Sequence, residues 1–245
     1  MPDPAAVPEV WRQSFTVRAV EAGPDERASV LTVADYFQEA AGEHARSGGV
    51  EVFELGERGG TWVLHRLQLR VEGLPAMRER VTVETWPSGR DRLRAFRDYR
   101  LWSDDGDVLV TGTSAWFVID VARRRPIRLP AGLDRFGAKE PEHVLSFGDP
   151  PQAPTEVEHA ARFAVRRSEL DRVGHANNVR FLEWALEALP SAEGLREIEV
   201  SYQTEAVYGD VVVSEAGPLV NGARPHRLSR ESDGATLALA RTVWT

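Results

Sequence analysis

The sequence contains no cysteine and a single lysine, Lys139. Without cysteine the chain can form no disulfide and no thiolate metal site, and it can have no cysteine nucleophile. No apolar run approaches the roughly 20 residues that a membrane-spanning helix needs. The first residues, MPDPAAVPEVW, contain neither the basic nor the apolar segment of a secretory signal peptide. These absences predict a cytoplasmic protein with no membrane span.

Basic charge is also scarce, because 30 lysine and arginine residues stand against 38 aspartate and glutamate residues, for a formal net charge of −8. A general nucleic-acid-binding protein needs a basic surface that neutralises phosphates, so we expect no nucleic-acid partner. The positive charge that is present gathers in two groups of arginines. The first group is Arg123, Arg124, Arg125 and Arg128, and the second is Arg162, Arg166, Arg167, Arg172 and Arg180.

The two halves of the 245-residue chain repeat each other. Residues 105–116, DGDVLVTGTSAW, match residues 233–244, DGATLALARTVW. Each copy is a turn followed by an alternating run, so each is predicted to be the second strand of a hairpin. Further upstream, residues 15–18 (FTVR) match residues 163–166 (FAVR). Repetition over this length predicts two units of the same structure.

Each half contains the same order of elements, which is one strand, one helix and then about four strands. The helices are predicted at Val33–Ser47, which ends at a Gly-Gly pair, and at residues 178–189, which Pro190 ends. Strands joined by short turns form antiparallel sheets, and each helix must bury its apolar side on a sheet face. We therefore expect an α+β fold of two antiparallel sheets, each wrapped on one long helix. The predicted parts are an N-terminal unit over 1–130, a proline-rich linker over 131–158 and a C-terminal unit over 159–245.

Acid, imidazole and amide side chains crowd against the start of the second helix, in SELDRVGHANNVRFLEWALEALP over residues 168–190. One interpretation is a polar loop that caps an amphipathic helix, with Asn177 as the N-cap. The other is a catalytic site. In it, Gly174 would let the backbone approach a ligand, and the N–H groups from Gly174 to Asn178 would be free to stabilise an oxyanion.

Six segments carry a family resemblance, namely FTVRAVEAGPDERASVLTVADYFQEAAGEHARSGG, TWVLHRLQLRV, VTVETWPSG with FRDYRLW after it, SAWFVIDVARRRPIRLP, SELDRVGHANNVRFLEWALEALP and EVSYQTEAVYGD. In this order they resemble the acyl-acyl carrier protein thioesterases, a family that includes the plant chain-terminating enzymes and their bacterial relatives. The resemblance extends from about Phe15 to Trp244. It implies a tandem (double) hotdog fold and hydrolysis of acyl-acyl carrier protein to a free fatty acid. The first hotdog would bind the acyl chain, and the second would hold the chemistry.

The family motif has Asp, Asn and His at alternate positions before the helix, and a further acid later in the chain. Here Asp171 and His175 occupy the Asp and His positions, and Glu205 occupies that of the later acid. Two positions depart from the pattern, because Val173 replaces the Asn and Ala206 stands where the plant enzymes have a cysteine. The resemblance therefore implies a general-base hydrolysis of the thioester. Either carboxylate would activate water, and the imidazole would orient the base or donate to the carbonyl oxygen.

Three further residues are predicted to contact substrate: Gly174, Asn177 and Asn178. The two asparagines are the nearest substitutes for the missing amide.

The cluster of acid, imidazole and amide side chains occurs in one half only. At an offset near 130, Glu205 aligns with Pro75, and the first half has no equivalent of DRVGH before its helix. A feature that the scaffold requires should occur in both copies, so this difference predicts a single active site in the second half.

Two alternatives remain open, an acyl-CoA thioesterase on the same fold and a non-catalytic acyl-binding module. The replacement of polar family positions by Val173 and Ala206 favours the acyl-binding module. No cofactor and no metal are expected.

Acyl carrier protein is acidic, so the second arginine group is predicted to bind it. A double hotdog already contains the pair that single hotdogs form by dimerising, so both a monomer and a homodimer are possible. The residues expected to close the acyl tunnel are Phe37, Trp62, Leu64, Leu69 or Trp86.

Overall fold

The computed structural model describes residues 7–50, 55–56, 59–129, 133, 136 and 143–245. The chain divides into two compact units. The first unit consists of Met1–His65 and Glu72–Ser146, and the second of Arg66–Val71 and Phe147–Thr245. Of the linker predicted over 131–158, residues 131–132, 134–135 and 137–142 lie outside the described residues.

The first unit is an antiparallel sheet with one long helix. Its elements are β1 (Trp11–Thr16), the short 3-10 helix η1 (Ala19–Glu21), α1 (Val30–Ser47), β2 (Gly60–Val71), β3 (Arg80–Arg90), β4 (Arg94–Ser103), β5 (Val108–Asp120) and β6 (Arg125–Ile127). The strands are ordered β1-β3-β4-β5-β2, and β6 pairs with β5. Strand β2 crosses the division, since its residues from Arg66 onward belong to the second unit.

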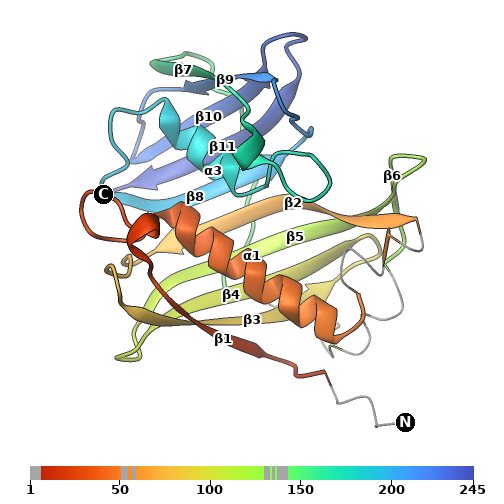
Figure 1. Ribbon diagram of the computed structural model, residues 1–245. Coiled ribbons are helices and arrows are strands. Elements are labelled where there is room, and N and C mark those ends of the chain that lie inside the picture. Colours follow the sequence, from red (N-terminus) through yellow and green to blue (C-terminus); the bar gives the residue numbers. More distant parts are fainter. Residues whose placement is uncertain (1–6, 51–54, 57–58, 130–132, 134–135, 137–142) are drawn as a thin grey trace. The chain divides into compact units, whose positions relative to one another are not determined.

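Helix α1 lies along one face of this sheet and packs against β1 and β3 (Figure 1). It begins three residues earlier than predicted, because the Ser29 hydroxyl accepts the Thr32 N–H at 3.1 Å and caps the helix. Val33 and Phe37, one turn apart, are almost fully buried. Phe37 stacks on Tyr99 of β4 at 4.8 Å between ring centroids, which fixes the helix against the sheet.

The second unit repeats this arrangement. Its elements are β7 (His159–Ala164), the 3-10 helix η3 (Arg167–Glu169), α3 (Arg180–Glu187), β8 (Leu195–Tyr202), β9 (Val211–Ala216), β10 (Ala223–Arg230) and β11 (Thr236–Trp244). The strand order is β2-β8-β11-β10-β9-β7, with residues 66–70 of β2 paired to β8. The predicted order of one strand, one helix and about four strands is confirmed, because β8–β11 follow α3 and β2–β5 with the three-residue β6 follow α1. The two hairpins that end in β5 and β11 are confirmed as well.

The prediction of a long second helix is wrong, because α3 has 8 residues where α1 has 18. The chain before α3 forms a turn in which the N–H of Arg180 bonds the Asn177 carbonyl, and Pro190 follows its other end. The short helix is nevertheless well anchored against β8, β9 and β10 (Figure 1). Its Trp184 is 2% exposed and touches the ring of Phe163.

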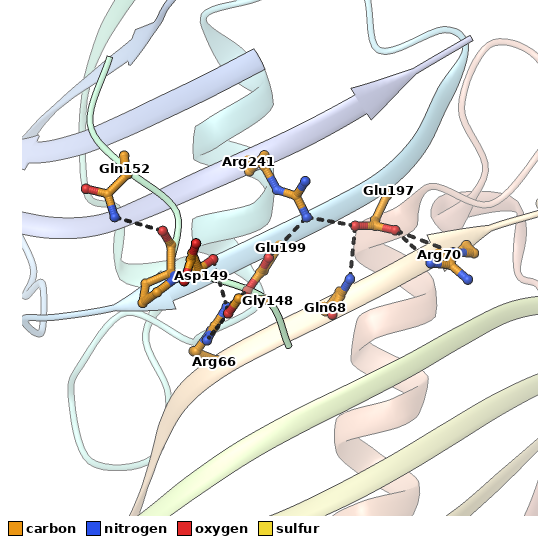
Figure 2. Close-up of polar contacts among 10 residues, drawn as sticks. Arg66, Gln68, Arg70, Gly148, Asp149, Gln152, Glu197, Glu199 and Arg241 are labelled. Carbon is orange, nitrogen blue, oxygen red and sulfur yellow. Dashed lines mark hydrogen bonds and ion pairs between the residues drawn. The ribbon is translucent and has the colours of Figure 1, made fainter. Parts of the chain in front are cut away.

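A network of charged side chains crosses β2, β8 and β11 in the second unit (Figure 2). Arg66 forms an ion pair with Glu199, whose side chain is 1% exposed, and Arg241 lies 3.5 Å from the same carboxylate. Arg66 also donates to the carbonyl oxygens of Gly148 and Asp149 at 3.1 and 3.4 Å. Its guanidinium therefore holds the chain at residues 148–149 against the sheet. The remaining members of the network are Gln68, Arg70 and Glu197.

Candidate active site

Asp171 organises the turn that carries the candidate site. Its Oδ1 accepts the N–H groups of Val173 at 2.9 Å and His175 at 3.1 Å. Its backbone N–H bonds the His175 carbonyl at 2.7 Å, which closes the turn. Gly174 has φ +86°, a conformation that glycine adopts without steric cost. The aspartate and the glycine therefore stabilise the backbone conformation of this turn, in addition to any chemical role.

A second loop lies beside this turn. The N–H of Ala176 bonds the Ala206 carbonyl at 2.8 Å, and His175 forms an antiparallel bridge with Val207. Two residues distant in sequence, His175 and Glu205, are thereby brought onto neighbouring stretches of backbone. Both are half-buried. Among the described residues, the His175 imidazole has no hydrogen-bond partner, so it is available to a ligand.

The two asparagines are held differently. The Asn177 Oδ1 accepts the Val179 N–H at 3.1 Å, so this side chain caps the turn that leads into α3. The prediction that Asn177 is the N-cap of the helix itself is wrong, because Val179 occupies that position and no side chain caps it. The backbone carbonyl of Asn178 accepts the Tyr202 hydroxyl at 3.0 Å. Burial raises the pKa of Tyr202, so its hydroxyl stays protonated and remains a donor. Sequence reasoning missed Tyr202, although its place three residues before Glu205 pointed to this region.

The prediction of several free N–H groups at the helix start is wrong. The N–H groups of Gly174, His175, Ala176 and Asn177 all have acceptors, which are the Asp171 backbone and side chain, the Ala206 carbonyl and the Glu169 carbonyl. Of the five N–H groups from Gly174 to Asn178, which the structure describes in full, only that of Asn178 has no acceptor. One N–H group of these five is therefore available to an oxyanion, because the other four are hydrogen-bonded within the turn and to its neighbouring loop.

The first unit has an equivalent of this turn, which corrects the expectation that DRVGH has no counterpart. There the N–H of Gly23 bonds the Arg27 carbonyl at 2.8 Å, as Asp171 bonds His175. The N–H of Ala28 bonds the Pro75 carbonyl at 2.9 Å, and Arg27 bridges Ala76. The residue at the place of Gly174 is Glu26, which also has a positive φ, of +57°.

These hydrogen bonds fix which residues correspond. Pro75 matches Ala206, so Glu205 matches Leu74, one residue away from the predicted match. His175 matches Arg27. Leucine offers neither an acid nor a base. The backbone is thus common to both units, and the combination of an imidazole with a neighbouring carboxylate occurs at the second turn alone.

The predicted docking arginines are not equally available. Arg162 pairs with Glu231, and Arg180 pairs with Glu183 at 3.0 Å. The guanidinium of Arg167 instead lies 4.1 Å above the ring of Tyr208. Among the described residues, no group of three or more His, Asp or Glu side chains is arranged to hold a metal ion. Within the same residues, no helix has the length and apolar character needed to cross a membrane.

Two family models match the chain along most of its length. Residues 8–133 match the acyl-ACP thioesterase N-terminal domain, and residues 152–245 match the acyl-ACP thioesterase C-terminal domain. Among curated proteins, the chain is 27% identical over 267 residues to a chloroplastic palmitoyl-acyl carrier protein thioesterase of Gossypium hirsutum, covering 96% of this chain and 63% of that protein. The corresponding protein of Arabidopsis thaliana is 29% identical, with 96% and 64% covered. The chain thus spans less than two thirds of the length of these relatives.

Solved structures share the fold. An acyl-ACP thioesterase from Bacteroides thetaiotaomicron superposes with a TM-score of 0.86 at 21% identity, covering 97% of this chain and 98% of the other. The 12:0-ACP thioesterase from Umbellularia californica gives a TM-score of 0.82 at 23% identity, with 97% and 98% covered. The predicted α+β double hotdog is therefore confirmed.

Proposed function

Because this chain belongs to the acyl-ACP thioesterase family, we propose that it hydrolyses the thioester of acyl-acyl carrier protein to a free fatty acid and the carrier thiol. The observation that supports this most directly is the difference between the two equivalent turns. Both have the same backbone hydrogen bonds, but only one of them places an imidazole, His175, on a bridge beside the loop that contains an acid, Glu205. A scaffold role does not explain this difference.

In the proposed reaction a carboxylate takes a proton from water, and the water oxygen attacks the thioester carbonyl carbon. The carbonyl oxygen becomes an oxyanion, which His175 and the unpaired N–H of Asn178 stabilise. The oxyanion then collapses, the carbon–sulfur bond breaks, and the leaving thiolate takes up the proton that the carboxylate removed from water, which restores the base. Glu205 is the stronger candidate for the base, since Oδ1 of Asp171 already accepts two N–H groups. Asp171 would then position His175 through the backbone of the turn.

The nucleophile in this proposal is water. Ala206, at the position of the plant cysteine, has no reactive group, is fully buried and serves the turn through its carbonyl oxygen. Its role is therefore to hold the two loops together. The other departure, Val173, is 62% exposed at the tip of the turn, where a side chain meets solvent or a partner.

The proposal is tested by thiol release from a panel of acyl-acyl carrier proteins and acyl-CoAs. We expect Glu205→Ala to lower kcat/KM by about 100-fold or more, as loss of a general base does. Asp171→Ala should also lower it, whereas Asp25→Ala, which removes the carboxylate that accepts the Arg27 N–H in the turn of the first unit, should not. No release by the wild type, from a protein that still binds acyl carriers, would support the acyl-binding module instead. Release from CoA thioesters alone would support an acyl-CoA thioesterase.

The partner in this proposal is acyl carrier protein. The cytoplasmic location, the choice between monomer and homodimer, and the absence of a cofactor stay predictions from the sequence. The predicted division of labour, with the acyl chain in the first hotdog and the chemistry in the second, is retained as part of the proposal. Trp86 is disfavoured as a residue that closes the tunnel. It lies opposite Asp98 in the register of β3 and β4, and neighbouring residues of a strand point to opposite faces. Trp86 is therefore on the other sheet face from Tyr99, on which Phe37 of the helix stacks.

A further inference from the structure

Three large apolar side chains are exposed around the candidate site. Val173 is 62% exposed, Val207 is 41% exposed and Tyr208 is 51% exposed. Single exposed apolar residues are common on protein surfaces, but a group of them beside a site marks a place of interaction. We call these three residues the apolar rim.

The backbone brings the members of the apolar rim together. The bridge between His175 and Val207 is antiparallel, so the chain on either side of it runs in opposite directions. Val173 precedes His175 by two residues, and Tyr208 follows Val207 directly. Both therefore lie within a residue or two of the bridge, on the stretches of backbone that flank His175 and Val207.

A cation completes this surface. The guanidinium of Arg167 lies 4.1 Å over the ring of Tyr208, and among the described residues it has no carboxylate partner. Stacking on a ring keeps an arginine charged and oriented while its N–H groups remain open to a second partner. Such a guanidinium suits a phosphate, which it can bind through two parallel hydrogen bonds.

The first unit lacks this surface, although it has the same turn. By the correspondence of the two turns, Val173 matches Asp25, Val207 matches Ala76 and Tyr208 matches Met77. The position of Arg167, at the start of η3, is Ala19 at the start of η1. The fold therefore does not require exposed apolar residues or a cation here, and their presence in one copy needs another explanation.

We propose that the apolar rim, together with Arg167, receives the phosphopantetheine arm of acyl carrier protein. This inference rests on the proposed hydrolysis, since the arm carries the thioester. Its apolar stretches would contact Val173 and Tyr208, and its phosphate would bind Arg167. The substitution at Val173 then has a reason, because the position contacts the carrier arm and no longer needs the amide of the family motif.

The test compares the binding of two forms of acyl carrier protein, holo, which bears the arm, and apo, which lacks it. Binding to the full chain is measured by calorimetry at low salt. We expect the wild type to bind holo protein about tenfold more tightly than apo protein, and Val173→Asp to reduce this ratio to about twofold. Tyr208→Ala should reduce it in the same way, because the ring also orients Arg167. The matched control is Val220→Asp, an equally exposed valine (59%) of the same unit, and it should keep the tenfold ratio.

The proposal is overturned if the wild type binds holo and apo protein equally, or if Val173→Asp and Val220→Asp behave alike. It is also overturned if Val173→Asp weakens apo binding as much as holo binding, since the surface would then contact the carrier's folded domain and not its arm. The proposed hydrolysis is tested separately by thiol release. Hydrolysis without a preference for holo protein would refute the apolar rim alone, and a holo preference without hydrolysis would refute the catalytic proposal alone.

Discussion

The turns at residues 23–29 and 171–177 have the same backbone and different side chains. Each closes with a hydrogen bond across five residues, each contains a residue with positive φ, and each pairs with a neighbouring loop through the same kind of bridge. In the first unit the bridge residue is Arg27, and in the second it is His175. The turn itself therefore belongs to the fold. Function is to be sought only in what the second copy adds to it.

The largest expected effect concerns the buried ion pair of the second unit, between Arg66 and Glu199. Arg66→Met leaves the almost fully buried carboxylate of Glu199 with Arg241 alone. We expect the free energy of unfolding to fall by about 3 kcal/mol, because breaking a buried ion pair leaves an uncompensated charge. Urea unfolding, followed by tryptophan fluorescence, measures this change.

The control for that experiment lies in the first unit. Among the described residues Arg97 has no carboxylate partner, and its guanidinium donates to His44 and Thr85 at 3.1 and 3.2 Å. Burial removes water from around the Arg97 guanidinium and so lowers its pKa. Arg97→Met should change the unfolding free energy by less than about 1 kcal/mol, because it also relieves this desolvation. Equal losses in Arg66→Met and Arg97→Met would mean that pairing is not what distinguishes the two arginines.

The second expected effect is on activity and uses the two bridge residues. His175→Ala should lower kcat/KM on acyl-acyl carrier protein by about 100-fold, which corresponds to about 2.7 kcal/mol of transition-state stabilisation. Arg27→Ala, at the same place on the other turn, should leave kcat/KM within about twofold of the wild type. A comparable loss in both variants would show that the position supports the fold and not the chemistry.

The smallest expected effect concerns the positive-φ positions. Gly174→Ala should destabilise the protein by about 1–2 kcal/mol, since the new Cβ meets no neighbour within 4 Å and the cost is conformational. Glu26→Gly should change stability by less than about 0.5 kcal/mol, because relief of strain is offset by the greater freedom of glycine in the unfolded chain. Thermal unfolding of both variants tests this. A neutral Gly174→Ala would mean that the second turn tolerates a side chain as the first does.

Most of the fold could be predicted from the sequence, because alternation and turn residues report strands directly. The repeat of residues 105–116 at 233–244 identified two corresponding hairpins, and Gly106 and Gly234 both have the positive φ that such turns need. The ends of the helices were less accessible. The capping bond of Ser29 begins α1 earlier than its apolar pattern suggests, and the turn at Asn177 begins α3 later.

The site was predicted only in part, because side-chain identity does not reveal which backbone groups are already bonded. The sequence contains Asp171 and Gly174, but it does not reveal that one oxygen of the aspartate accepts two backbone N–H groups. It also conceals the turn of the first unit, since GPDERAS and DRVGHAN share only one residue at the same place, the alanine at positions 28 and 176. Hydrogen bonds define this similarity, and residue types do not.

The passage of β2 from one unit into the other has a practical consequence for anyone who wishes to express the halves separately. A gene fragment that starts at Phe147 would omit Arg66–Val71, which the second unit uses as the strand beside β8. The fragment would present β8 as an unpaired edge and would carry the buried Glu199 without Arg66. Cloning at the linker would thus yield an aggregation-prone product, whereas a fusion that supplies β2 in front of residue 147 would restore both the edge and the charge.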